Sequence, residues 1–359
     1  MRFGALITSI VLIILTGCSA VGPPTVPRDR FDYNTAIADS WKEQTLLNIV
    51  KLRYAEMPLF VEVASVVSGY SLESAVNLGG TIRSDSSILS DSLNLGASGK
   101  FTDRPTITYS PITGAKFNQS FMHPIPPKAL LFLLQSGWPA DYVLPITLSS
   151  INGFRGRIAA GEDTRPGDPE FYQSISLLRR IQKSGAVEMR VVMDEENKNE
   201  TTVLFFYRKN SPRTVKDDIE EFNRILGLNP LNDEFHVSYG FLPKTDQELA
   251  MVSRSMLQIM IELAGEVNVP EVHVQEGRTI PTILQPHPSE KEIRYLAHIQ
   301  SGTDKPEDAY VAVEFKDHWF WIDDRDFISK RTFTFLMILF SLTETGGKEG
   351  LPLVTIPAG

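Results

Sequence analysis

Cysteine is nearly absent from this chain, because its 359 residues include one, Cys18. A single thiol excludes disulfides within the chain, so a folded body must rely on buried apolar surface. Hydrophobic residues make up 42% and charged residues 22% of the sequence, which is ordinary for a globular protein. The length allows one large domain or two smaller ones, each with an ample core.

Long hydrophobic runs are missing after the N-terminus, and positive charge is in deficit. The best later candidate for a membrane span, Phe333 to Leu342, is about half of the ~20 residues that cross a bilayer as a helix, so it predicts a buried helix. The formal net charge is −9. Such an acidic balance argues against nucleic acid as a partner and against broad adhesion to anionic lipid headgroups.

The common catalytic motifs are absent as well. There is no Gly-x-Ser-x-Gly nucleophile elbow, and Gly79-Gly80 lies within a strand pattern rather than before a helix, which excludes a glycine-rich phosphate loop. No two of the 6 histidines show the i, i+4 spacing of a helical metal pair. A zinc site would need folding to bring His273 to His287, or His298 to His318. We therefore expect no cofactor.

The N-terminus carries the most specific motif. Arg2 precedes an apolar run from Phe3 to Leu15, and Leu15-Thr16-Gly17-Cys18 follows at its end. This layout resembles the signal peptide and lipobox of bacterial lipoproteins. The resemblance implies a diacylglyceryl group on the Cys18 thiol, cleavage between Gly17 and Cys18, and acylation of the new amine by a fatty acid such as palmitate. The alternative is an uncleaved signal anchor, for which the apolar run is too short.

Further features of the lipoprotein pattern suggest a location and a layout. An aspartate after the lipidated cysteine commonly retains such proteins in the inner membrane, and this chain has Ser19. The resemblance therefore implies an outer-membrane lipoprotein whose body faces the periplasm. We expect four segments. They are a signal peptide (1–17), a Gly- and Pro-rich lipidated tether (18–30), an N-terminal helix with a strand-rich subdomain (31–152), and an α+β subdomain (153–359).

Helical and strand patterns are interspersed, and much of the strand pairing is local. This predicts an α+β fold of mixed helices and mainly antiparallel sheet rather than a doubly wound sheet. The body also looks like uncharacterised lipoproteins of Gram-negative bacteria, through residues 28–34 and 321–326. Helices are predicted over 34–54, 127–134, 168–184, 215–226, 245–263 and 329–343. Strands are predicted over 142–148, 186–193, 202–207, 309–315 and 319–322.

Residues 72–103 predict a hairpin of two long strands around a polar loop at 84–92. Apolar and polar residues alternate in both arms, and each arm is long enough to cross a bilayer as a tilted strand. One interpretation is a half-buried sheet of the soluble body. The other is a membrane hairpin, with Leu78 and Leu95 on its apolar face, that closes a barrel in a ring of subunits. That plan resembles the curli-secretion channel lipoproteins.

Two clusters are candidate sites. Asp323, Asp324 and Asp326, with His318 nearby, hold the densest set of oxygen and imidazole ligands, as a hard cation such as Ca²⁺ would require. The alternative is a charged strand-to-helix junction, because acids are favoured near the start of a helix. In the second cluster, Arg254 lies between Ser253 and Ser255 and is a candidate anion ligand. Its alternative is the solvated face of an amphipathic 245–263 helix that also carries Glu248 and Glu262.

Three hypotheses of function follow. The first is a membrane-anchored envelope lipoprotein that acts as a non-catalytic adaptor or assembly factor for an envelope protein partner. The second is an oligomeric outer-membrane channel subunit that uses the 72–103 hairpin. The third is a lipid-anchored hydrolase that uses Asp323, Asp324 or Asp326 with His318. The sequence favours a non-enzymatic role, since no catalytic motif is recognisable.

Overall fold

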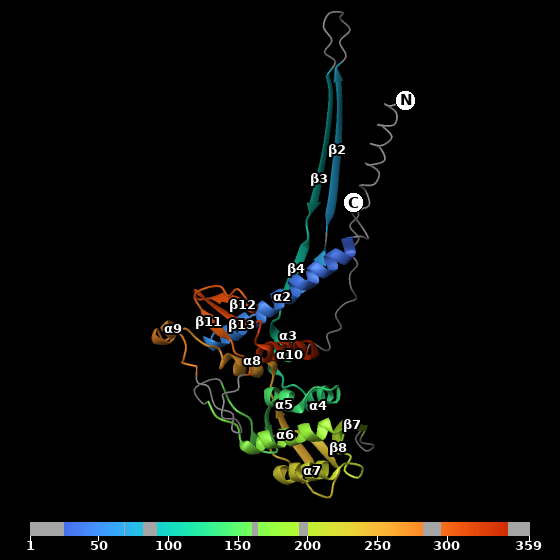
Figure 1. Cartoon of the computed structure of the whole chain (residues 1–359), viewed down its shortest axis with the longest axis vertical. Coiled ribbons are helices and arrows are strands. Elements are labelled where there is room, and N and C mark those ends of the chain that lie inside the picture. The colour runs from blue at the N-terminus through green and yellow to red at the C-terminus, as the bar shows by residue number, and fades with distance from the viewer. Residues whose placement is uncertain are drawn as a thin grey trace, which may run out of the picture. The chain divides into compact units, whose positions relative to one another are not determined.

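The computed structural model describes residues 25–67, 69–81, 92–159, 164–193, 200–282 and 296–343 (Figure 1). Helices and mainly antiparallel sheets confirm the predicted α+β fold. The chain divides into two compact units, one of residues 1–41 with 60–112 and one of residues 42–59 with 113–359. The division differs from the predicted boundary at residue 153. No helix among the described residues is both long and apolar enough to cross a membrane.

Helix α2 (Thr25–Arg53) begins earlier than predicted, so residues 25–30 of the predicted tether are helical. Pro27 lies in the first turn of α2. A backbone N–H there has no carbonyl acceptor within the helix, so the N–H that proline lacks costs no hydrogen bond. The boundary between the two units falls within α2, after Trp41. The predicted signal peptide and Cys18 lie outside the described residues.

The first unit contains two antiparallel ladders. Strand β1 (Val61–Val67) pairs with β4 (Thr106–Pro111), and β2 (Tyr70–Thr81) pairs with β3 (Ser92–Asp103). The N–H of Arg104 donates to the Gly69 carbonyl (2.9 Å) between the ladders, so the pairing runs from one ladder into the next. The predicted hairpin is confirmed, and its polar loop lies outside the described residues.

The second unit has a six-stranded sheet in the order β6-β5-β10-β9-β8-β7, antiparallel except for the pair β9–β10. Helix α4 packs on β7, β9 and β10, and α6 contacts both α5 and α7 (Figure 1). The helix predicted over 168–184 is confirmed as α6, whose apolar residues at helical spacing, Phe171, Ile175, Leu178 and Ile181, are all buried. The strands are β5 (Leu148–Ile151), β6 (Phe154–Arg155), β7 (Val187–Met193), β8 (Glu200–Phe206), β9 (Glu234–Tyr239) and β10 (Glu248–Ser253). The helices are α4 (Pro127–Gln135), α5 (Ala140–Thr147), α6 (Pro169–Lys183) and α7 (Arg213–Leu226).

Two predicted elements are wrong. Residues 142–147 form most of helix α5 rather than a strand, although Pro145 lies inside that helix, and Leu148 begins β5. Residues 248–253 form strand β10 rather than the first half of a helix. The helix there is the shorter α8 (Met256–Ala264), and Ser255 and Gln258 form its capping box.

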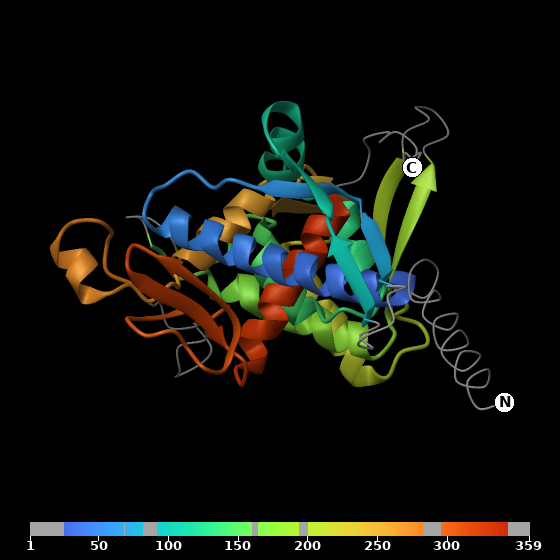
Figure 2. The ribbon, with the colours of Figure 1, turned by 90° about the horizontal axis from the view of Figure 1, so that it is seen from above.

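A three-stranded sheet with the order β11-β13-β12 completes the second unit. The predicted strands 309–315 and 319–322 are confirmed as an antiparallel pair, and the chain turns between them at Lys316 and Asp317, which have positive φ angles of 52° and 62°. Helix α10 packs on β13 and on the short π-helix η2 (Asn118–Met122). The Thr45 hydroxyl of α2 donates to the sulfur of Met337 in α10 (3.5 Å). Figure 2 shows the blue helix α2 crossing the red helix α10. The remaining elements are α3 (Gly114–Phe117), α9 (Glu271–Gln275), β11 (Gln300–Gly302), β12 (Ala309–Phe315), β13 (His318–Asp323) and α10 (Phe327–Thr343).

Candidate functional site

The β2–β3 ribbon is the first candidate surface. Each strand has 12 residues, and no third strand pairs with either of them in the described part of the chain. The register places Glu73 opposite Lys100 and Ala75 opposite Ser98, and all four side chains are exposed. This face of the ribbon matches the polar half of the predicted alternation.

The apolar positions of the predicted alternation also lie opposite one another in the ladder. Leu78 lies opposite Leu95 in the ladder, and Leu72 lies opposite Phe101. These are backbone positions, and the side chains of all four residues lie outside the described part of the structure. The register therefore sets apolar positions against apolar positions at these two pairs, whereas Ser74 lies opposite Gly99 between them.

The acidic cluster at residues 323–326 is a strand-to-helix junction. Asp326 is the N-cap of α10, and its carboxylate accepts the N–H of Ser329 (3.1 Å) and the Ser329 hydroxyl (2.5 Å). Asp324 pairs with Lys330 (2.6 Å), and Asp323 accepts the N–H of Arg325 (2.8 Å). Each predicted ligand is thus engaged by neighbours in the chain.

The structure brings together a histidine pair that the sequence did not suggest. The rings of His273 and His318 lie 4.6 Å apart, and His298 instead contacts Asn268 (3.1 Å). His287 lies outside the described residues. Across the described ranges, no three His, Cys, Asp or Glu side chains are grouped so that they could share a metal ion.

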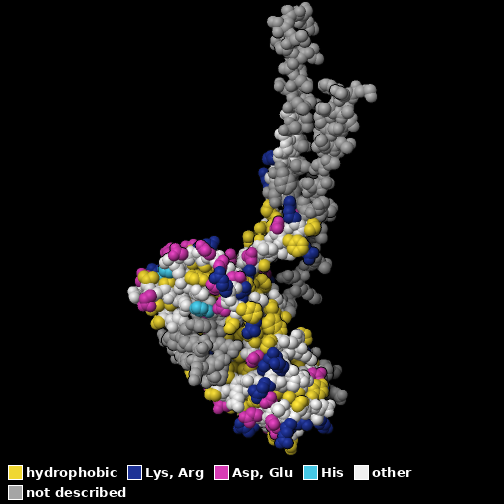
Figure 3. Space-filling view, in the orientation of Figure 1, with side chains coloured by type: hydrophobic (Ala, Val, Ile, Leu, Met, Phe, Trp, Pro, Cys, Tyr) yellow, Lys and Arg dark blue, Asp and Glu magenta, His cyan; other side chains and the backbone are white. Residues whose placement is uncertain are grey.

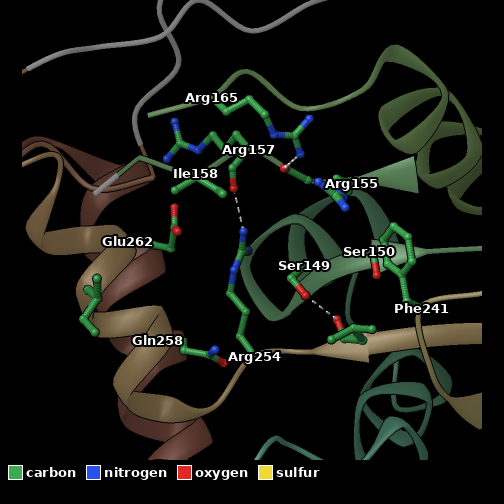
Figure 4. A pocket seen from close by; sticks show the side chains of 13 residues that line it. Ser149, Ser150, Arg155, Arg157, Ile158, Arg165, Phe241, Arg254, Gln258 and Glu262 are labelled. Carbon is green, nitrogen blue, oxygen red and sulfur yellow. Dashed lines mark hydrogen bonds between the residues drawn. The ribbon is translucent and has the colours of Figure 1, made fainter. Parts of the chain in front are cut away.

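A cavity of about 390 Å³ in the second unit is the second candidate site (Figure 4). Residues from β5, β6, β10 and α8 and from the intervening loops line it. Arginine dominates its polar lining, with Arg155, Arg157, Arg165 and Arg254 against one carboxylate, Glu262. The chain as a whole has a net charge of −9, whereas the residues that line this cavity carry an excess of positive charge.

Strand pairing explains one wall of the cavity. Val252 of β10 pairs with Ser150 of β5, and Ser150 pairs with Arg155 of β6. Residues directly opposite each other in a ladder share a face of the sheet. The three side chains therefore form one row across the edge of the six-stranded sheet.

Arg254 is the most deeply buried arginine of the cavity, with 4% of its surface exposed. Its Nη1 donates to the carbonyls of Pro145 (2.8 Å) and Ile146 (3.0 Å), and its Nη2 donates to the carbonyl of Arg157 (2.8 Å). Pro145 and Ile146 lie in the last turn of α5, where a cation is favoured by the helix dipole. Burial lowers the pKa of Arg254 from its usual value. The predicted solvated helix face is therefore wrong at this residue.

Arg157 and Arg165 are held by carboxylates behind the cavity. Arg157 forms an ion pair with the buried Glu266, and Arg165 forms one with Asp168 (3.0 Å). Burial alone lowers the pKa of Arg157, but the adjacent Glu266 carboxylate outweighs it and the pKa is raised. A second bond from Arg165 to the Gly156 carbonyl (3.1 Å) fixes the loop that carries Arg157.

Arg155 differs from the other three arginines because its guanidinium forms neither an ion pair nor a hydrogen bond with a described residue, whereas Arg157 and Arg165 pair with carboxylates and Arg254 donates to backbone carbonyls. It is exposed and lies over the ring of Phe241, 4.9 Å from the ring centroid. Such a contact orients the guanidinium without using its N–H donors in the plane. Figure 4 shows Arg155 and Phe241 on the same side of the cavity.

Comparisons with known proteins do not identify this architecture. No family model, no curated protein and no solved structure matches the chain.

Proposed function

We propose that the protein is a non-catalytic envelope lipoprotein that assembles with further copies of itself through the β2–β3 ribbon. The observation that carries the proposal is the ribbon, because neither of its 12-residue strands has a second neighbour among the described residues. In an antiparallel pair, half of the backbone N–H and C=O groups point away from the partner strand. Such an edge is a template for another strand.

A second copy is the occupant that fits both edges at once. Two-stranded hairpins are at best marginally stable alone, and they gain stability when further strands join them. A ring of copies satisfies every edge, whereas a single different partner leaves one edge open. A strand of 12 residues also exceeds the ~10 that a tilted strand needs to cross a bilayer. The ring therefore supports the hypothesis of a channel subunit.

The proposed lipid anchor explains how the copies would reach the membrane and meet there. Acylation at Cys18 holds the chain at the outer membrane, which concentrates the copies in two dimensions and favours their association. A hydrolase has less support, because Asp324 and Asp326 are engaged by Lys330 and Ser329 at the junction. A channel built from the ribbon requires no catalytic group.

The absolute mass of the protein tests the proposal. Lipidated protein extracted from membranes with detergent is compared by light scattering with a Cys18→Ser chain that lacks residues 1–17. We expect a ring-sized oligomer for the extracted form. A monomer in the extracted form would overturn the proposal and would favour an adaptor for other envelope proteins.

Substitutions in the ribbon locate the interface. Leu78→Asp and Leu95→Asp place a charge at opposed positions of the apolar alternation, and each should abolish the oligomer while the second unit stays folded. Ala75→Asp is the matched control, because it adds the same charge at an exposed position of the same strand. If all three variants keep the oligomer, the copies do not meet through the ribbon.

A further inference from the structure

We propose that the arginine-lined cavity of the second unit binds a small acidic amphiphile, with its carboxylate or phosphate group against Arg155 and its apolar part against the rim. The proposal concerns a site that is separate from the ribbon in sequence and in unit. It does not depend on self-assembly.

The charge count of the cavity favours an anion. Three carboxylates lie close to the four guanidinium groups, namely the lining residue Glu262 and the ion-pair partners Asp168 and Glu266. One positive charge is therefore left without a counterion from these residues. Glu262 itself accepts the N–H of Ala159 (2.8 Å), which anchors its carboxylate at the wall.

The available donors lie on one face of the sheet. Arg155 can offer its planar guanidinium fork, the geometry that suits bidentate binding of a carboxylate or phosphate. Beside it, the Ser150 hydroxyl is buried and has no hydrogen-bond partner among the described residues, although buried polar groups are normally paired. Ser150 and Arg155 are directly opposed in the β5–β6 ladder, so one oxyanion can meet both side chains.

The rim of the cavity is apolar. Ile158, Phe241 and Ile261 line it and remain 39%, 39% and 38% exposed, although large aliphatic and aromatic side chains are favoured in the interior. Ligand sites combine apolar walls with a few placed polar groups, and this cavity has both. A bare inorganic anion would leave the rim uncovered.

The surface elsewhere supports a specific site rather than a general affinity for anions. Around β11 to β13, the face shown in Figure 3 carries a concentration of acidic side chains. Those that are exposed include Asp304, Glu307, Asp308, Glu314, Asp317 and Asp324. An anion is repelled from that region and finds its complementary charge in the cavity.

Calorimetric titration of the mature chain (residues 18–359) tests the proposal, with Cys18→Ser so that no detergent competes for the probe. The probes are octyl phosphate, inorganic phosphate and octanol, which separate the contributions of charge and apolar surface. We expect octyl phosphate to bind at least about tenfold more tightly than either of the others. Equal affinity for octanol and octyl phosphate would overturn the proposal.

Variants assign the binding to the cavity. Arg155→Gln should weaken octyl phosphate binding about tenfold, the loss expected for one charge-assisted bond, and should leave the melting temperature unchanged because Arg155 is exposed. Arg224→Gln is the matched control, since Arg224 is an exposed arginine of α7 that pairs with Glu221, and neither residue lines the cavity. Unchanged binding by Arg155→Gln, or an equal loss in both variants, would contradict the assignment.

An experiment with lipid vesicles distinguishes a membrane lipid from a free amphiphile as the source of the anionic group. Flotation with vesicles of phosphatidylglycerol, compared with phosphatidylcholine, reports whether a lipid headgroup in a bilayer occupies the cavity. Binding to the anionic vesicles that is lost in Arg155→Gln assigns a membrane lipid. Binding of octyl phosphate alone assigns a free amphiphile, and binding of neither probe overturns the proposal.

Discussion

The phenol oxygen of Tyr54 lies 2.7 Å from Nδ1 of His273, and both residues are buried in the second unit. Burial raises the pKa of Tyr54 to about 12, so the phenol is neutral and donates its proton. Burial also lowers the pKa of His273, which favours the neutral imidazole, and the Nδ1 of a neutral ring can accept this proton. The two neutral groups therefore satisfy each other, and protonation of the imidazole would place a charge in this buried site.

The burial of His273 predicts that the protein loses stability in mild acid. The folded-state pKa of His273 lies below its ordinary value of 6.5, so the unfolded chain takes up the proton first. The stabilisation is complete above pH 6.5 and is lost as the pH falls toward the folded-state pKa. At pH 5.5 the loss has a ceiling of about 1.4 kcal/mol.

Urea unfolding at pH 7.5 and 5.5 measures this effect. His273→Gln keeps an acceptor but cannot titrate, so its stability should change less between the two pH values than that of the wild type. The groups that face His273, including His318, Lys316, Arg278 and Glu276, stay in place in this variant. His236→Gln is the control, because His236 is exposed on β9 and should leave the full pH dependence intact.

Asp326 gives a prediction that separates a helix cap from a metal ligand. Asp326→Ala should lower the free energy of unfolding by about 1 kcal/mol, because the N–H of Ser329 loses its acceptor at the start of α10. Asp326→Asn should retain most of this stability, since asparagine caps as well as aspartate. A site for Ca²⁺ predicts the opposite, namely an equal loss in both variants and a melting temperature that rises with Ca²⁺ only in the wild type.

Local sequence patterns predicted the elements in which apolar residues recur with the period of a helix or of a strand. The apolar spacing of residues 171–181 predicted α6, and the alternation of 72–101 predicted the β2–β3 ribbon. Residues 142–148 are a short apolar run, and such a run fits a strand or a buried helix equally well. Contacts from Trp138 and Tyr142 to Phe335 of α10 favour the helix. These contacts join residues that are far apart in the sequence, so a local pattern cannot reveal them.

The missed helix start had a usable signal. Thr245-Asp246-Gln247-Glu248 mimics a capping box, but Glu248 accepts the N–H of Lys244 (2.5 Å) in a turn that leads into β10. The capping box that the structure forms, between Ser255 and Gln258, has the same spacing and lies further along the chain, at the start of α8. The cavity had no such signal, because β5 and β10 are about 100 residues apart and only their pairing brings Ser150 to Val252.

The β12–β13 turn predicts a stabilising substitution. Asp317 has a φ of 62°, a conformation that glycine adopts without strain. Asp317→Gly should therefore raise the free energy of unfolding by about 0.5 kcal/mol, and it leaves the ion pair between Lys316 and Glu56 (2.7 Å) intact. Asp304→Gly is the control, because Asp304 is also exposed but has no positive φ. Chemical denaturation should show a gain for the first variant and a loss for the second.

The proposed lipidation of Cys18 predicts that the mass and the location of the protein depend on this residue. In a Gram-negative host, wild-type protein should take up labelled palmitate, and its N-terminal peptide should begin at Cys18 with the mass of the attached lipid. Cys18→Ser should lose the label and leave the membrane fraction, because serine lacks the thiol that accepts the diacylglyceryl group. Ser19→Asp should keep the label but move the protein to the inner membrane, which separates anchoring from sorting. A mature protein that retains residues 1–17 would show an uncleaved signal anchor instead and would leave the ribbon without the lipid tether that the assembly proposal uses.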